Sequence, residues 1–211
     1  MIKPDRCVVT VATGRGFLVC GNRYAYIITA AHCLPHLPPA HPFSRLEERT
    51  YANLIGPLGG PPTVWAECLF ADPVADLAIL CEPDSQALGE QYEDYADLIE
   101  DTENREPLDI DSGGGRNGYV LNLEGDWVPV KLTVNARSIL VAGNKVPFGA
   151  SGSPILDNEG NAIGVISTGS LNPKLTAALP GWALDELFYR LKDRQRLTVR
   201  QRRAALRLSR H

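Results

Sequence analysis

Short apolar runs, interrupted every few residues by Gly, Asn or Pro, constrain the fold of this chain more than any other feature. In the first half, these runs cover residues 7–12, 17–20, 24–29, 63–70 and 77–81. Two of the interruptions, Gly14-Arg15-Gly16 and Gly21-Asn22, have the composition of tight turns. Runs of this length joined by such turns are typical of antiparallel hairpins. The pattern therefore predicts an all-β fold.

The second half repeats this pattern. Strand-like runs cover residues 119–123, 127–134, 139–141, 154–156 and 162–167, and Asp157-Asn158-Glu159-Gly160-Asn161 predicts a turn between the last two. Since each half holds about six short strands, we predict two packed six-stranded antiparallel β-barrels. Apolar residues recur at helical spacing over residues 182–192, which predicts a C-terminal α-helix.

An acidic segment at residues 82–111 connects the two halves. It contains twelve acidic residues and one arginine, and residues 91–99 within it predict a short helix. The Gly-rich stretch that follows marks a boundary, so we assign the first barrel to residues 1–111 and the second to residues 112–211. The second unit includes the C-terminal helix and a basic tail. Solvation alone accounts for both charged segments.

Three polar residues at the edges of predicted strands supply the groups that nucleophilic catalysis needs. His32 follows one apolar run, Asp76 precedes another, and Ser151 lies in a Gly-rich turn. A serine hydroxyl becomes a nucleophile when an imidazole accepts its proton, and a carboxylate orients that imidazole. The three residues therefore predict a catalytic triad. Asp72, four positions before Asp76, is the nearest rival for the acid.

Glycines on both sides of the predicted nucleophile favour a sharp turn. Gly149 and Gly152 allow the backbone around Ser151 to approach a substrate closely. The N–H groups of Gly149 and Ser151 can then point at one spot and bind an oxyanion.

The segments around these residues resemble the signatures of trypsin-like (chymotrypsin-fold) serine peptidases. TAAHC contains His32, DLAIL begins with Asp76 and GASGSP contains Ser151, in the same order as in that family. GRGFLV and GVISTG are similar to further family segments, so the resemblance extends over about residues 7–191. It implies a serine endopeptidase that acts through an acyl-enzyme. His32 and Asp76 would come from the first barrel and Ser151 from the second.

The departures from the family pattern are informative. Animal members have Asp before the nucleophile, held by a freshly cut N-terminus, whereas this chain has Ala150. No such salt bridge can form, and the chain is more similar to bacterial trypsin-like peptidase domains. A peptidase-fold protein-interaction module with little or no proteolytic activity is the alternative interpretation.

The resemblance also implies substrate contacts. Ser167, Thr168 and Gly169 would pair with the substrate backbone as an added strand. Lys145, six residues before the nucleophile, matches the position at the base of the specificity pocket, and Lys174 would approach the same pocket. Like charges repel in a desolvated pocket, so we predict cleavage after small, apolar or acidic residues rather than after Arg or Lys. Alternatively, both lysines lie in solvent, which still leaves no acid to bind a basic side chain.

The five cysteines do not suggest a metal site. Cys7, Cys20, Cys33, Cys68 and Cys81 have spacings that fit no zinc pattern, and we expect neither a metal nor a cofactor. In the family, a disulfide often occupies the places of Cys20 and Cys33. We expect these two to lie near each other across the first barrel and to be thiols in the cell.

The expected partners are proteins. No export signal and no apolar stretch of about 20 residues is visible, so we expect a cytoplasmic protein that does not enter a membrane. The expected substrate is a protein or peptide, and a dedicated protein partner stays open. The Arg-rich tail has no aromatic residue after Tyr189, which disfavours nucleic-acid binding.

Overall fold

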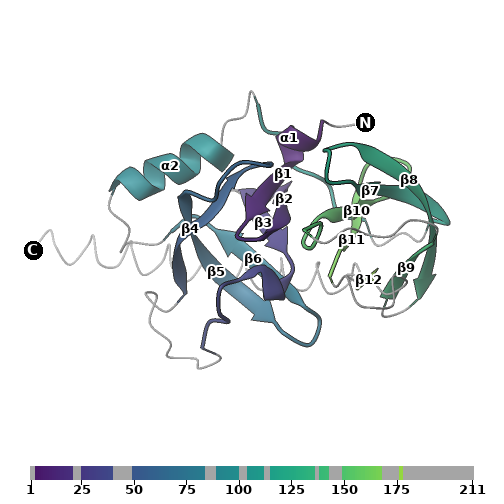
Figure 1. Cartoon of the computed structure of the whole chain (residues 1–211), viewed down its shortest axis with the longest axis horizontal. Coiled ribbons are helices and arrows are strands. Elements are labelled where there is room, and N and C mark those ends of the chain that lie inside the picture. The colour runs from purple at the N-terminus through teal and green to yellow at the C-terminus, as the bar shows by residue number, and fades with distance from the viewer. Residues whose placement is uncertain are drawn as a thin grey trace, which may run out of the picture.

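The computed structural model describes residues 3–20, 25–39, 49–83, 89–99, 104–111, 115–135, 138–142, 149–167 and 176–177. The first six strands are β1 (Val8–Val11), β2 (Gly14–Cys20), β3 (Ala25–Thr29), β4 (Thr50–Pro57), β5 (Val64–Asp72) and β6 (Leu77–Cys81). They form a closed antiparallel barrel in the order β1-β2-β3-β6-β5-β4 (Figure 1). The first predicted barrel is thus confirmed.

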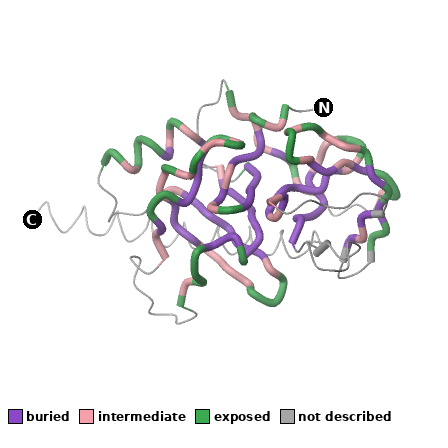
Figure 2. Tube along the Cα trace, in the orientation of Figure 1, coloured by how far each residue is buried: buried purple, intermediate pink, exposed green. Residues whose placement is uncertain are grey.

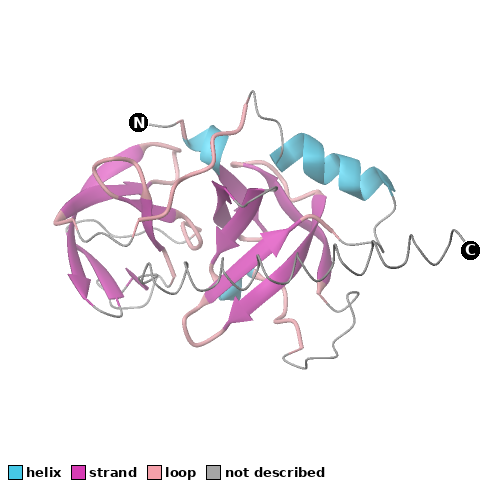
Figure 3. Cartoon of the chain, turned by 180° about the vertical axis from the view of Figure 1, so that it is seen from behind, coloured by secondary structure: helices cyan, strands magenta, loops and turns pink. Residues whose placement is uncertain are grey.

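The second sheet is also antiparallel. Its strands are β7 (Asn117–Leu121), β8 (Trp127–Asn135), β9 (Ser138–Ala142), β10 (Pro154–Leu156), β11 (Ala162–Val165) and β12 (Thr176–Ala177). They pair in the order β11-β10-β7-β8-β9-β12 and form a curled six-stranded sheet beside the barrel (Figures 1 and 3). The all-β class is confirmed. The predicted C-terminal helix and the basic tail lie outside the described residues.

Strands β2 and β3 are buried along most of their length (Figure 2), because their two faces meet different apolar clusters. Leu18 and Ile27 point into the barrel interior, where they join the cluster that contains Leu80. Phe17 and Ile28 point outward and pack with residues of the second sheet. The continuous apolar runs in the sequence therefore record burial between two sheets.

Two details of the first barrel differ from the sequence predictions. Gly14-Arg15-Gly16 is not a turn but the first part of β2, since the chain turns earlier, at Ala12. A Cβ at Gly16 would lie 2.6 Å from Ile27 Cγ2, so this glycine allows close strand packing rather than a turn. The sequence also gave no sign of β4, whose pairing with β5 is interrupted by a register shift after Tyr51.

Two helices and a connecting segment complete the described chain. Helix α1 (Pro4–Cys7) precedes β1, and α2 (Gly89–Ile99), predicted at residues 91–99, packs against β5. Residues 104–111 connect the two sheets through short parallel bridges, Val19 with Leu108 and Ile110 with Ala162. In the part of the chain that the structure describes, no helix has the length and apolar character that a membrane span needs.

Candidate active site

His32 lies on a short helical turn that follows β3. This 3₁₀ turn, η1 (Ala31–Cys33), places its flanking residues in the barrel core, with Ala31 at 2% and Cys33 at 3% exposure. The His32 side chain itself is 45% exposed. The apolar neighbours thus fix the turn in the core and leave the imidazole at the surface.

Asp76 faces this imidazole from the turn between β5 and β6. Its Oδ2 lies 2.7 Å from His32 Nδ1, and its Oδ1 accepts the backbone N–H of His32 at 2.9 Å. Asp76 has a positive φ of 53°, a conformation that costs a residue with a Cβ about 1–2 kcal/mol. Backbone strain of this kind is concentrated at functional sites. The sequence contains no signal for it.

Asp72, the rival acid, has a different role. Its Oδ1 accepts the N–H groups of Val74 and Ala75 at 2.8 and 3.0 Å, so it closes the turn that carries Asp76. Turns closed in this way by an Asp side chain are common. Of the two acids, the structure brings only Asp76 into contact with His32.

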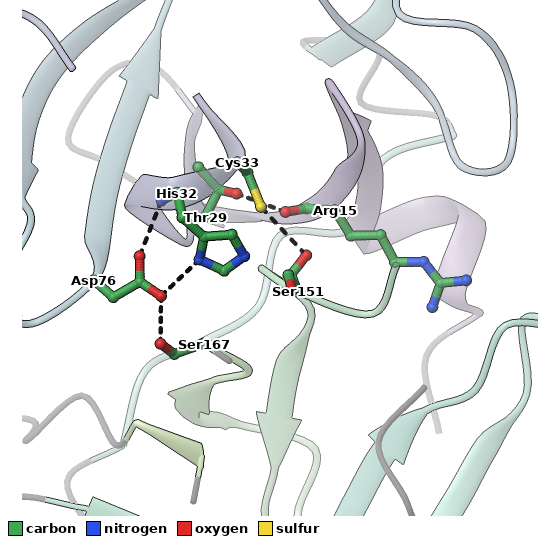
Figure 4. A network of polar contacts seen from close by, with 7 residues as sticks. All are labelled: Arg15, Thr29, His32, Cys33, Asp76, Ser151 and Ser167. Atoms are coloured by element: carbon green, nitrogen blue, oxygen red, sulfur yellow. Dashed lines mark hydrogen bonds and ion pairs between the residues drawn. The ribbon is translucent and has the colours of Figure 1, made fainter. Parts of the chain in front are cut away.

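Ser167 provides a further contact to the carboxylate. Its hydroxyl donates a short hydrogen bond to Asp76 Oδ2, and the residue is 4% exposed just after β11. The carboxylate therefore interacts with a backbone N–H, an imidazole nitrogen and a hydroxyl, with donors from both sheets (Figure 4). A proton on Nδ1 satisfies this arrangement and leaves Nε2 as an acceptor. Sequence reasoning assigned Ser167 to the substrate backbone and missed this side-chain contact.

The loop that carries Ser151 is held from two sides. The Ser151 carbonyl accepts the N–H of Arg15 in β2 at 2.7 Å, and Gly152 N–H donates to the carbonyl of Ile166 at 2.6 Å. Gly152 has a φ of +83°, and a Cβ there would lie 1.8 Å from the Arg15 carbonyl oxygen and 2.6 Å from Thr29 Oγ1. Only glycine permits this approach of the loop to the first barrel.

The imidazole lies between the Asp76 carboxylate and Ser151 (Figure 4). Within the described ranges, no hydrogen bond joins the Ser151 hydroxyl to His32. Such contacts are often long in unliganded enzymes and shorten when a substrate binds. The three residues predicted as the triad thus meet at one place, between the two sheets.

Gly149 and Ser151 each present a backbone N–H beside the predicted nucleophile. Gly149 has a φ of +93°, and no hydrogen bond among the described residues takes up either N–H group. Two such donors beside a nucleophile can stabilise the negative charge of a tetrahedral intermediate.

The predicted proximity of Cys20 and Cys33 is wrong. Cys20 pairs with Ala25 at one end of the β2–β3 hairpin, whereas Cys33 lies at the other end, close enough to Gly14 that a Cβ there would be 2.5 Å from its Sγ. The strand between Gly14 and Cys20 spans about 20 Å, far too long for a disulfide. All five cysteines are free. Burial raises the pKa of Cys33 to about 11, so it is a neutral thiol that packs in the core.

Several predicted substrate residues are not among those described. Lys145, Thr168 and Gly169 fall outside the described residues, as does Lys174. In the ranges given above, no group of three or more His, Cys, Asp or Glu side chains is arranged to hold a metal ion.

Comparison with known proteins identifies the fold. No family model matches the sequence. A search of curated proteins also finds no match. Solved structures do match. The serine protease of human pathogenic astrovirus has a TM-score of 0.50 and 18% identity, and the match covers 85% of this chain and 91% of that one.

Two further structures give similar values. The MamO protease domain from Magnetospirillum magneticum has a TM-score of 0.53 and 15% identity, over 87% of this chain and 96% of its own. The Rv3671c protease in its inactive form has a TM-score of 0.53 and 18% identity, over 87% of both chains. The protein therefore has the fold of the chymotrypsin-like serine proteases. At this level of identity the likeness defines the fold alone.

Proposed function

We propose that the protein is a serine endopeptidase that hydrolyses peptide bonds through an acyl-enzyme intermediate. The observation that carries the proposal is the Asp76 carboxylate, which contacts His32 twice and accepts a hydrogen bond from Ser167 on the other sheet. A carboxylate held in this way fixes the imidazole with Nε2 available for the proton of Ser151.

The reaction follows from these positions. Ser151 Oγ attacks the carbonyl carbon of the scissile bond while His32 Nε2 takes the hydroxyl proton, and Asp76 stabilises the imidazolium. The N–H groups of Gly149 and Ser151 donate hydrogen bonds to the oxyanion. When the intermediate collapses, the C–N bond breaks and His32 gives its proton to the leaving amine. Water then attacks the acyl-enzyme while His32 accepts its proton. When this second intermediate collapses, the bond between the acyl carbon and Ser151 Oγ breaks, His32 returns the proton to Oγ, and the carboxylic acid product is released.

For the substrate, we propose its chemical class and its mode of binding. A protein or peptide would bind in extended form along residues 167–169, with Ser167, Thr168 and Gly169 pairing with its backbone. By the family resemblance, Lys145 would lie at the base of the pocket and would disfavour a basic side chain before the cleaved bond.

Hydrolysis of fluorescein-labelled casein by matched serine variants tests the proposal. Ser151→Ala should lower the rate by at least about three orders of magnitude, because it removes the nucleophile. Ser153→Ala is the control: its hydroxyl lies in the same loop, is fully buried and has no hydrogen-bond partner among the described residues. Equal activity of wild type and Ser151→Ala would refute the proposal. Absence of hydrolysis by a folded wild-type protein would instead favour the peptidase-fold interaction module.

A further inference from the structure

Arg15 is a buried arginine beside the proposed nucleophile, and the triad does not use it. It lies in β2, is 7% exposed, and its backbone touches the Ser151 loop twice. Its N–H donates to the Ser151 carbonyl at 2.7 Å, and its carbonyl oxygen faces Gly152 while accepting the Thr29 hydroxyl at 2.6 Å. The backbone of one residue thus fixes the loop to the first barrel.

The side chain of Arg15 crosses to the second sheet. Its guanidinium donates to the backbone carbonyls of Asn122 and Leu123, at 2.7 and 3.2 Å. These two residues begin the turn between β7 and β8, which is closed by a hydrogen bond from Asp126 N–H to Asn122 Oδ1 at 2.7 Å. A guanidinium that donates to two neighbouring carbonyls fixes the orientation of the turn as well as its distance from β2.

This turn contacts the predicted oxyanion loop. A Cβ at Gly149 would lie 3.6 Å from Leu123 Cδ2, so the half-exposed Leu123 side chain lies beside Gly149. Arg15 therefore supports both N–H donors, Ser151 through its backbone and Gly149 through Leu123. The same strand pairs with β3, after which His32 follows.

A purely structural role would not require a cation here. Burial lowers the pKa of Arg15, and the Glu124 carboxylate in the same turn offsets this only in part. Burying a charge is costly, and an apolar residue of similar volume often stabilises a protein as well or better. A guanidinium differs from an apolar side chain in that it sets the orientation of the groups it binds.

We infer that Arg15 is a positioning residue that holds the N–H groups of Gly149 and Ser151 in the geometry required for oxyanion binding. The inference rests on the proposed peptidase function. Arg15 acts through the β7–β8 turn and the Ser151 carbonyl, without contact with the substrate.

Steady-state hydrolysis of p-nitrophenyl acetate, an ester that needs no specificity pocket, provides the kinetic test. Arg15→Met should lower kcat roughly ten- to hundredfold with little change in KM, because a small misplacement of the donors affects the transition state more than ester binding. Arg15→Lys keeps the charge and one donor and should recover part of the loss. Equal kcat in Arg15→Met and wild type would overturn the inference.

Arg105→Met is the matched control. The Arg105 guanidinium also donates to two backbone carbonyls, those of Leu98 and Asp5, at 2.5 and 2.6 Å, but neither belongs to the site. This variant should keep the wild-type kcat even if it is less stable to urea. A similar fall of kcat in both variants, in proportion to lost stability, would make the role of Arg15 structural and overturn the inference.

A second readout does not depend on activity. Amide hydrogen exchange by NMR should show that Arg15→Met lowers the protection of the Asn122 and Gly152 N–H groups relative to the Ile28 amide in the core, whereas Arg105→Met leaves that ratio unchanged. Both amides are hydrogen-bonded, to Asp126 and Ile166. If wild type hydrolyses no ester, the proposed function fails, and unchanged protection in Arg15→Met separately refutes the positioning role.

Discussion

Gly152 is the residue at which the addition of a single methyl group should most reduce stability and activity. In Gly152→Ala the new Cβ would lie 1.8 Å from the Arg15 carbonyl oxygen and 2.6 Å from Thr29 Oγ1. Real Cβ atoms do not approach a backbone carbonyl so closely, so the loop or β2 must move. That movement would disturb the hydrogen bond from Arg15 N–H to the Ser151 carbonyl.

The cost has two parts that a matched variant separates. Placing Ala at the positive φ of +83° costs about 1–2 kcal/mol, and the overpacking adds about 1–3 kcal/mol. Gly160→Ala carries the first cost alone, because Gly160 has a φ of +96° and open space around it. Together the two terms are a large part of the roughly 5–15 kcal/mol by which a typical domain is stable.

Urea unfolding of both variants, followed by fluorescence, measures the difference. Gly160→Ala should lose about 1–2 kcal/mol and keep its casein hydrolysis. Gly152→Ala should lose clearly more, and its remaining folded fraction should be inactive. Equal loss of stability in the two variants, or full activity in folded Gly152→Ala, would refute the account of the loop as pinned against β2.

Three further predictions concern the acid, the thiols and specificity. Asp76→Asn should lower casein hydrolysis by about four orders of magnitude, because the imidazole then adopts the wrong tautomer. Asp72→Asn should stay close to wild type, because its amide oxygen can still accept the N–H groups of the turn. Comparable losses in the two variants would contradict the assignment of Asp76 as the acid. Iodoacetamide at pH 8 should modify the exposed Cys20 in the folded protein but not the buried Cys33, and rapid alkylation of Cys33 would contradict its buried position. Burial raises the pKa of Cys33 from 9.0 to about 11. This raised pKa should contribute stability below pH 9 that is lost as the pH rises towards 11, because the thiol of the unfolded chain ionises first. A peptide library should show cleavage after small, apolar or acidic residues, and a profile dominated by Arg or Lys before the cut would refute the role proposed for Lys145.

Much of the fold was predictable because its signals are local. The apolar runs around Phe17 and Ile28 predicted strands, and the order of His32, Asp76 and Ser151 at strand ends predicted the residues that meet at the site. These features depend on residue types at short spacing, which the sequence displays directly.

The errors arose where register or contacts between sheets decide the structure. The family resemblance implies that Cys20 and Cys33 lie together, and nothing in the sequence reveals that Gly16 pairs with Thr29, which places the two cysteines at opposite ends of the hairpin. A shift of register changes every cross-strand neighbour, and the residues of a single strand do not show which register it adopts with its partner.

Contacts between the sheets were equally hidden. The hydrogen bond between Ser167 and Asp76 joins residues 91 positions apart, and no sequence pattern near either residue predicts it. Arg15 between two glycines predicted a turn, yet close packing of β2 on its neighbours requires those glycines. The sequence therefore indicated which residues to consider, and the packing of the two sheets determined what they contact.

The most direct test of the proposed function is mass spectrometry of the protein after reaction with a fluorophosphonate probe. These reagents form a stable adduct with a serine that a neighbouring base activates. The account predicts one adduct per chain, mapped to Ser151, and none in Ser151→Ala or after unfolding. A folded protein that forms no adduct, or forms it at a different serine, would contradict the account.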